Sequence, residues 1–313
     1  MNEKVKVSDL RAGDIVLLEP SEDKISKLIA KITHSPVSHT TLSCGPKEPV
    51  GNVIEETPPC ALVGTLLNRT SRTAYVMRLN PEVEDCQPVM DIASRYVSEK
   101  LPYAKAQLPF IALYCIAGNI TGGTKLQGIV MKFVSLAMEI LIQLEDSIIY
   151  KGQEAMMCSQ FAYHCYKEAG EAYEIHMKEM AGLPLIDGII ERLQADPSKY
   201  DSQLFLIRGE TPEVTDEQVD CLIDELYEEL NNDDTSFNRL DSNELSEDFI
   251  IEVTRFCIQV VKTFLKEEDC DKTDAVSHLL KLKDMYEYFI SPGDLFTNTK
   301  NLICLGTVDY SET

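Results

Sequence analysis

The chain has 313 residues, 44% of them hydrophobic, which is enough for one large or two ordinary globular domains. Its formal net charge of −23 argues against nucleic acid as a partner, because a surface of that sign repels the phosphate backbone. The first residues lack the basic and apolar regions of a secretory signal, and the ten cysteines are scattered along a long chain. Together these features predict a cytoplasmic protein with reduced thiols.

The cysteines and histidines do not have the spacing of metal ligands. No two cysteines form a C-x-x-C pair, and the five histidines form neither an H-x-x-x-H nor an H-E-x-x-H pattern. We therefore expect no metal site and no cofactor.

The first hundred residues predict a small, mostly antiparallel sheet. Four short strands are expected at residues 14–19, 38–43, 52–56 and 73–79, and glycines and prolines separate them. Apolar residues at helical spacing predict a helix over residues 24–32 and a second over residues 88–100.

Residues 110–144 are unusually apolar and are interrupted only around the glycine pair at 122–123. Neither half reaches the ~20 residues needed to span a bilayer. The pattern favours a buried helical hairpin, and we expect an apolar helical insertion over about residues 106–146. The alternative is an apolar cover for a site that takes a lipid or acyl chain, or a peripheral membrane contact through residues 110–144.

The second half of the chain is dominated by helical patterns. A helix is expected over residues 158–169, followed by an acidic stretch at residues 210–248 that keeps helical spacing in part. Further helices are expected at 249–266 and 274–289, and the C-terminal residues after them are expected to form a turn and a strand. The sequence thus predicts an α+β protein in which residues 1–170 and 289–313 form one domain and residues 171–288 form an acidic helical insertion or subdomain.

The strongest candidate for chemistry is Cys158, which stands where an apolar run opens a helix. The unpaired N–H groups and the dipole at a helix start favour a thiolate, but a free thiol with a pKa of about 8.5 still needs a base at neutral pH. His39 lies in a predicted strand, and the next strand carries Glu55 and Glu56. Because neighbouring residues of a strand face opposite sides, only one of these carboxylates can orient His39. Nucleophile, base and orienting carboxylate form the logic of a cysteine protease triad.

Other residues compete for these roles. His34 lies just before a Ser-Pro turn and is an alternative base. Cys165 and His164 share the helix of Cys158 but lie two turns further along, where packing in the core is the expected role.

A resemblance supports the triad. In chain order, six short blocks resemble the YiiX-like branch of the permuted NlpC-type, papain-like superfamily, in which the histidine strand precedes the cysteine helix. The blocks are GDIVL at 13–17, SH at 38–39, VIE at 53–55, LPY at 101–103, CSQF at 158–161 and SPGDL at 291–295.

The resemblance implies a circularly permuted papain-like fold, with the sheet packed on the nucleophile helix and with residues 1–170 and 289–313 as the catalytic domain. It implies Cys158 as nucleophile, His39 as general base and Glu55 as the residue that orients the imidazole. Tyr103 falls where the family places a tyrosine near the nucleophile, as a candidate to bind the oxyanion. Ser159 and Ser38, which adjoin the two reactive residues, are further candidates for the oxyanion or the substrate.

The chain departs from the family pattern in two places. Ala104 stands where the family often has an acidic residue, which affects the assignment of Tyr103. The apolar segment between Tyr103 and Cys158 is longer than the compact pattern needs, which makes the substrate pocket specific to this chain.

The function implied is a cysteine hydrolase or acyltransferase that acts on an amide or ester bond through a thioester at Cys158. The substrate class is a small molecule, either a peptide or amino-acid amide or a lipid-like acyl compound; the lipid-like alternative fits the resemblance of permuted relatives to lecithin retinol acyltransferase. The alternative is an inactive papain-like scaffold that binds a basic protein partner through its acidic helical region. The sequence does not indicate an oligomeric state.

Overall fold

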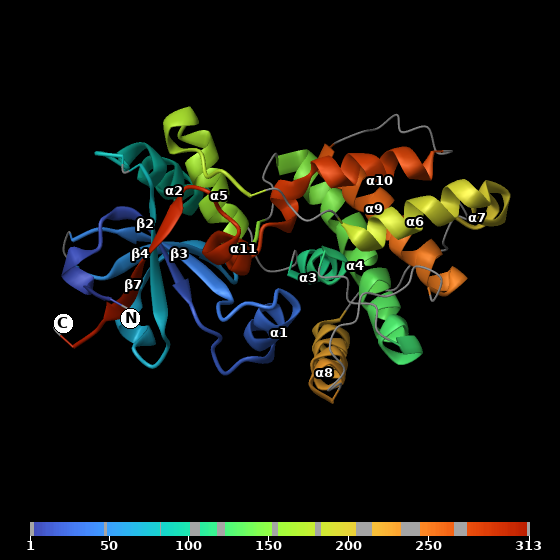
Figure 1. Cartoon of the computed structure of the whole chain (residues 1–313), viewed down its shortest axis with the longest axis horizontal. Coiled ribbons are helices and arrows are strands. Elements are labelled where there is room, and N and C mark those ends of the chain that lie inside the picture. Colours follow the sequence, from blue (N-terminus) through green and yellow to red (C-terminus); the bar gives the residue numbers. More distant parts are fainter. Residues whose placement is uncertain are drawn as a thin grey trace. The chain divides into compact units, whose positions relative to one another are not determined.

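A computed structural model describes residues 3–46, 49–81, 83–100, 107–117, 123–151, 156–178, 183–204, 215–232, 245–265 and 274–311. The fold class is α+β, as expected. The chain divides into two compact units, and Figure 1 labels most of their helices and several of the strands. The first comprises Met1–Ala104, Ala155–Met180 and Ile290–Thr313, and the second comprises Lys105–Glu154 and Ala181–Phe289.

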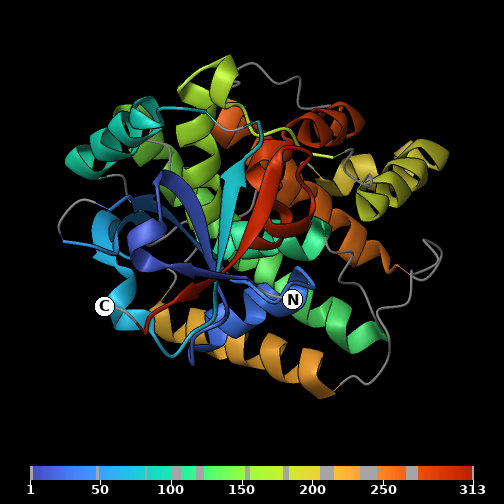
Figure 2. The same cartoon turned by 60° about the vertical axis from the view of Figure 1, so that its left-hand side comes forward.

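The first unit is built on one seven-stranded sheet with the strand order β1-β7-β6-β2-β3-β4-β5. Its strands are β1 Lys4–Lys6, β2 Ala12–Leu18, β3 His39–Cys44, β4 Asn52–Thr57, β5 Cys60–Thr65, β6 Ala74–Leu79 and β7 Leu302–Asp309. The sheet is mostly antiparallel, as expected, and β1 and β7 are its one parallel pair among the described strands. The C-terminal strand β7 enters the sheet between β1 and β6 (Figure 2).

Helices of the first unit cover the sheet and connect its strands. They are α1 Lys24–Ile32, α2 Gln87–Glu99, α5 Cys158–Glu168 and α11 Pro292–Thr297, with 3₁₀ turns η1 Val7–Asp9, η2 Leu66–Arg69 and η3 Glu171–Tyr173. The helices predicted over 24–32, 88–100 and 158–169 are confirmed to within a residue of their ends.

The two faces of the sheet follow the alternation of the strands. Leu42 and Ile54 belong to a core with Phe161 of α5, while Val16 and Val53 belong to a separate core on the other face. Helix α5 packs against β3 and β4. The start of α5 therefore lies close to these two strands.

The segment just after α5 stays with the sheet. We expected residues 171–288 as one subdomain, whereas residues up to Met180 belong to the first unit. Backbone hydrogen bonds explain this difference: Lys178 donates to Asn298, and Lys300 donates to His176. They hold this segment against the chain between α11 and β7.

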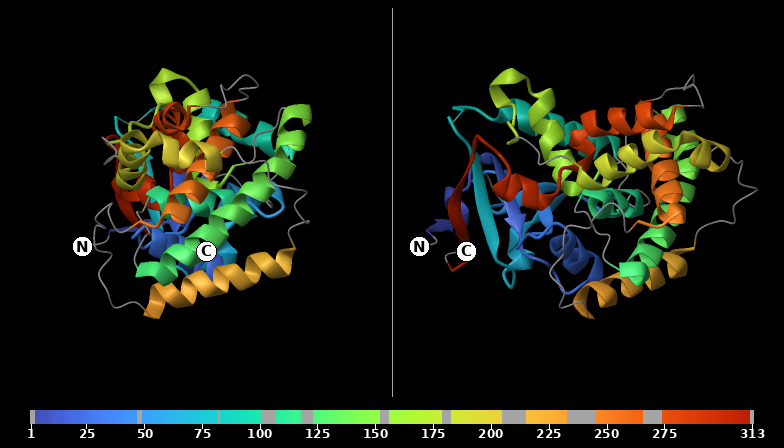
Figure 3. Two further views of the ribbon diagram at one scale, coloured as in Figure 1. Left: turned by 90° about the vertical axis from the view of Figure 1, so that its right-hand side faces the viewer. Right: turned by 45° about the vertical axis from the view of Figure 1, so that its right-hand side comes forward.

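The second unit is helical. Its elements are α3 Gln107–Ala117, α4 Gly123–Lys151, α6 Pro184–Ala195, α7 Pro197–Leu204, α8 Asp216–Asn232, α9 Glu247–Leu265, α10 Ala275–Asp284 and the 3₁₀ turn η5 Tyr286–Phe289. Helix α4 packs along α9 and contacts α8, which lies beside it in Figure 3. We expected the apolar hairpin as an insertion in the first domain, but it shares a unit with residues 181–289.

Apolar burial accounts for this grouping. Phe133 of α4 and Phe256 of α9 are both fully buried, and the apolar residues 111–116 of α3 are buried as well. These side chains leave water by packing on the other helices of the unit. None of the helices within the described ranges has both the length and the apolar character that crossing a membrane requires.

Candidate active site

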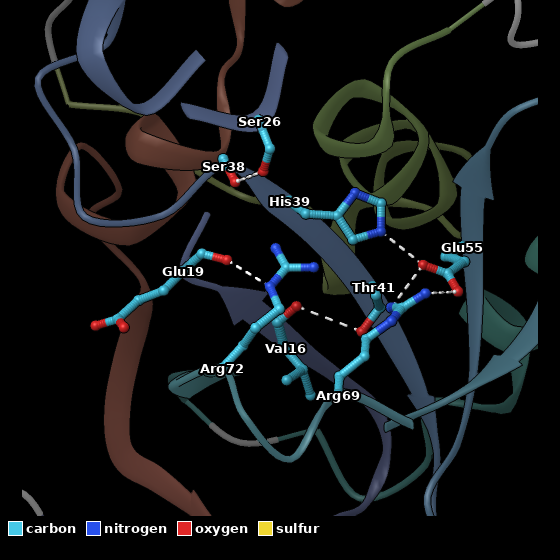
Figure 4. Close-up of polar contacts among 9 residues, drawn as sticks. All are labelled: Val16, Glu19, Ser26, Ser38, His39, Thr41, Glu55, Arg69 and Arg72. Carbon is cyan, nitrogen blue, oxygen red and sulfur yellow. Dashed lines mark hydrogen bonds and ion pairs between the residues drawn. The ribbon is translucent and has the colours of Figure 1, made fainter. Parts of the chain in front are cut away.

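Two neighbouring strands place a histidine next to a carboxylate. His39 is the first residue of β3, and Glu55 lies in β4, whose register with β3 pairs Leu42 with Ile54. The imidazole Nε2 lies 2.6 Å from Oε2 of Glu55 (Figure 4). A neutral ring that carries its proton on Nε2 donates to Glu55 and leaves Nδ1 as an acceptor.

Arg69 forms a bidentate ion pair with the same carboxylate. Its Nη1 donates to Oε2 of Glu55 at 2.8 Å and its Nη2 donates to Oε1 at 2.5 Å (Figure 4). Burial of Glu55 by itself raises the pKa of the carboxyl, but the hydrogen bonds and charges of His39 and Arg69 outweigh burial and lower the pKa to about 2. Glu55 is therefore a fixed anion that orients the imidazole.

Gly64 of β5 makes room for this carboxylate. A Cβ atom at position 64 would lie 2.2 Å from Oε1 of Glu55, closer than two such atoms can approach. Position 64 pairs with Val53, two residues before Glu55, in the β4–β5 ladder. The absence of a side chain at Gly64 thus sets the position of Glu55.

Helix α5 places Cys158 at its first position. The side-chain oxygen of Gln160 accepts a hydrogen bond from the N–H of Met157 at 2.9 Å, which fixes the chain where it enters the helix. Phe161 is the first residue of the helix to donate to a helix carbonyl, that of Met157, so the N–H groups before it lie at the open N-terminal end of the helix. These N–H groups surround the thiol with positive partial charge.

Two contacts tie α5 to the rest of its unit. Ser159 donates its hydroxyl proton to the Ile290 carbonyl at 2.7 Å, and Tyr166 donates to the Gly13 carbonyl. The backbone of Gly13 has a φ of +85°, a conformation that favours glycine. The two ends of α5 are thereby fixed relative to the sheet.

The thiol of Cys158 and the imidazole of His39 are direct neighbours. Burial lowers the pKa of His39, but the charge of Cys158, its side-chain hydrogen bond and the matching contributions of Glu55 raise the pKa to about 9. Because Nε2 is bound to Glu55, Nδ1 is the ring nitrogen left to accept the thiol proton. The Cys158 residue is almost completely buried, at 1% exposure.

The SPGDL block supports the strand that carries His39. Ser291 begins α11 and donates to Asp294 at 2.6 Å, while the N–H of Asp294 donates back to Ser291. A Cβ atom on Gly293 would lie 2.6 Å from Cβ of Ser35, in the turn just before β3. This close approach fixes the turn that leads into His39.

The remaining predicted residues have other positions. Ser38 shares a hydrogen bond with Ser26 at 2.7 Å (Figure 4), and Ser159 donates its hydroxyl to a carbonyl as described. The alternative base His34 is exposed just beyond the end of α1, with a left-handed φ of +49°. Tyr103 lies outside the described residues.

The structure distinguishes Glu55 from Glu56. Glu55 contacts His39, whereas Glu56 lies on the opposite face of β4 with Ile54, on the side packed by α5. Glu56 is fully buried. It therefore does not take the role of orienting His39, for which it was the alternative.

Sequence reasoning missed Arg69 and Gly64. Both depend on the hairpin of β4 and β5, and β5 was not predicted. A signal was present in the stretch CALVGT at residues 60–65, which has strand composition directly after the turn at Pro58 and Pro59.

Within the part of the chain that the structure describes, no three His, Cys, Asp or Glu side chains gather as metal ligands would. The site thus brings a thiol, an imidazole and a carboxylate together on the sheet and helix of the first unit. Comparisons of the chain with protein-family models, with curated proteins and with solved structures found no match.

Proposed function

We propose that this chain is a cysteine-dependent hydrolase or acyltransferase with a circularly permuted papain-like fold. The observation that carries the proposal is the contact of the Cys158 thiol, at the start of α5, with an imidazole that Glu55 holds at 2.6 Å. A partly buried histidine between a thiol and a carboxylate is the arrangement that activates a cysteine nucleophile.

The chemistry follows from the positions of these groups. Nδ1 of His39 takes the thiol proton, and the thiolate attacks the carbonyl carbon of an amide or ester. The backbone N–H of Cys158 is placed to donate to the oxyanion. His39 then gives its proton to the leaving amine or alcohol, and water or an acceptor amine releases the acyl group from the thioester with His39 as base.

The apolar helices bear on the substrate class. Along α3 and α4, the apolar side chains that suggested a lipid substrate are buried among helices of their own unit. This packing supports a polar substrate, a peptide or amino-acid amide, over a long acyl chain.

The test is selective alkylation. Wild-type protein is treated with limiting iodoacetamide near neutral pH, and each modified cysteine is mapped by mass spectrometry. We expect Cys158 to react first. Cys165 of the same helix is the internal control, because burial raises the pKa of its thiol well above the usual value.

His39→Ala should abolish the selectivity, and His34→Ala is the matched control that should leave it intact. If Cys158 and the other thiols of wild-type protein were all labelled slowly and equally, the proposed enzymatic function would be contradicted and the alternative of an inactive scaffold favoured. An active enzyme would next be screened against amides, esters and thioesters, with Cys158→Ala as the blank.

A further inference from the structure

Arg72 is a cation beside the candidate site that the proposed mechanism does not use. It follows the η2 turn that carries Arg69, and its N–H donates to the Arg69 carbonyl at 2.9 Å. The side chains of both arginines extend from this turn toward the end of β3 where His39 lies (Figure 4). Two guanidinium groups thus stand near the imidazole, in a chain whose formal net charge is −23.

Strand pairing sets how close Arg72 is to His39. Nε of Arg72 donates to the backbone carbonyl of Glu19 at 2.6 Å (Figure 4). Glu19 directly follows Leu18, the residue of β2 that pairs with His39 in the ladder. Paired residues of antiparallel strands lie ~5 Å apart and one further residue adds ~3.4 Å, so the anchor of Arg72 is within about 10 Å of the His39 backbone.

The guanidinium of Arg72 forms no ion pair within the described residues. Asp23 and Glu55 are the described carboxylates that act on it, and they act by charge alone. The Asp23 side chain caps the start of α1. The Glu55 carboxylate is already bound by Arg69 and His39. Nη2 of Arg72 is buried and has no hydrogen-bond partner in the described part of the chain.

These surroundings favour an anionic ligand for Arg72. Burial and the charge of Arg69 both lower the pKa of Arg72, which means that the surroundings oppose its positive charge. A guanidinium nevertheless stays protonated at neutral pH, so its missing hydrogen bond and its unbalanced charge cost free energy. The side chain is only partly buried, and a ligand from solvent can therefore reach it. A carboxylate matches the paired N–H donors of a guanidinium.

We propose that Arg72 binds a carboxylate of the substrate, on the leaving-group side of the scissile amide. This inference rests on the function proposed above and names its substrate class: an N-acyl amino acid, or a peptide with a free C-terminal carboxylate. His39 protonates the leaving nitrogen, so the part of the substrate beside His39 and Arg72 is the leaving amine. One residue spans at most ~3.6 Å, so one or two residues cover the distance from that nitrogen to Arg72.

Arg72 holds and orients the substrate, and it exchanges no proton. The sulfur of Cys158 bonds to the carbonyl carbon, the C–N bond breaks, and the nitrogen takes the proton of His39. The released amino acid keeps its carboxylate on Arg72 until it dissociates. Water then hydrolyses the thioester and releases the acyl group as a carboxylic acid.

The test compares two alkylating probes that differ in one charge. N-iodoacetylglycine ends in a carboxylate, and N-iodoacetylglycinamide ends in a neutral amide. In wild type, Cys158 should react faster with the carboxylate probe. Arg72→Gln should lower the ratio of the two rates by about tenfold, the effect of losing one hydrogen bond between charged groups. Arg72→Lys, which keeps the charge without the paired donors, should restore part of the ratio.

Arg95→Gln is the matched control. Arg95 pairs with Glu168 at the opposite end of α5 from Cys158, so this variant removes the same charge from the same unit at a distance from the site. Its ratio should be that of wild type. A second measurement needs no variant, and it decides the outcome even where Arg72→Gln does not fold: N-acetylglycine should protect wild-type Cys158 from iodoacetamide at lower concentration than N-acetylglycinamide does.

The outcomes separate this inference from the proposed function. If iodoacetamide labels wild-type Cys158 no faster than Cys165, the proposed function fails and this inference with it. If Cys158 is labelled selectively but Arg72→Gln keeps the wild-type ratio, or the two acetyl compounds protect equally, the carboxylate site is overturned while the enzyme stands. An equal fall of the ratio in Arg95→Gln would assign the effect to overall charge and would also overturn the site.

Discussion

At the residue scale, His39 and Glu55 each stabilise the charged form of the other. The pKa of Glu55 is lowered from 4.5 to about 2, so its contribution to stability is fully present above pH 4.5 and is lost as the pH falls toward 2. Against the effect of burial, Cys158 and, to a smaller extent, Glu55 raise the pKa of His39 from 6.5 to about 9, so its contribution is fully present below pH 6.5 and is lost as the pH rises toward 9. Both contributions are complete between about pH 4.5 and 6.5.

Removing the charge of Glu55 should therefore lower the free energy of unfolding less at acidic pH than at pH 6. Glu55→Gln is expected to lower the free energy of unfolding by about 3 kcal/mol at pH 6, the value that corresponds to the shifted pKa. The difference from wild type should shrink as the pH approaches 2, where wild-type Glu55 is itself half protonated. Urea denaturation at pH 6 and pH 2.5 measures both values.

The control is Glu22→Gln. Glu22 pairs with Lys27 on the exposed surface, where an ion pair contributes little, so this variant should resemble wild type at both pH values. A stability difference for Glu55→Gln that stayed constant across the acid range would show that Glu55 is not a buried anion.

At the element scale, local patterns predicted the helices of the first unit, and pairing between strands decided the arrangement of the candidate site. The period of apolar residues was sufficient for α1 and α5, because helical contacts are local. Whether Glu55 or Glu56 meets His39 depends on which face of β4 each occupies, and sequence left both open. The β4–β5 hairpin brings Arg69 to Glu55. The two residues are 14 positions apart in the sequence, and that spacing by itself does not predict a contact.

The hairpin makes a specific prediction at Gly64. Gly64→Ala places a Cβ atom where the Glu55 carboxylate lies, so the carboxylate must leave both His39 and Arg69. We expect a loss of about 3 kcal/mol in the free energy of unfolding, as for a broken buried ion pair. Selective alkylation of Cys158 should fall with it.

Gly128→Ala is the matched control, in helix α4 of the second unit. A Cβ atom there meets nothing within 4 Å, so alanine should raise stability by about 0.5–1 kcal/mol through its higher helix propensity. If Gly64→Ala had the stability and the Cys158 alkylation rate of wild type, the position of the Glu55 carboxylate beside residue 64 would not matter for either property.

At the scale of the whole molecule, the strand and helix patterns predicted the α+β class but not how the segments divide between the units. The apolar helices α3 and α4 belong with residues 181–289 because their buried faces pack on α9 and α6, and such long-range packing leaves no mark on local periodicity. The acidic segment is also partly neutralised within its unit: Glu225 and Glu229 of α8 pair with Lys132 and Lys125 of α4. Those two carboxylates are less available to a basic partner than the sequence suggested.

The central claim is that Cys158 and His39 share a proton, and an NMR titration of the His39 ring tests it most directly. In wild type the ring should stay protonated up to about pH 9. In Cys158→Ala the charge and hydrogen bond of the thiol are gone while burial still opposes the imidazolium, so the midpoint should fall clearly below that of wild type. The same midpoint in both proteins would contradict the account, because the thiol would then have no influence on its supposed base.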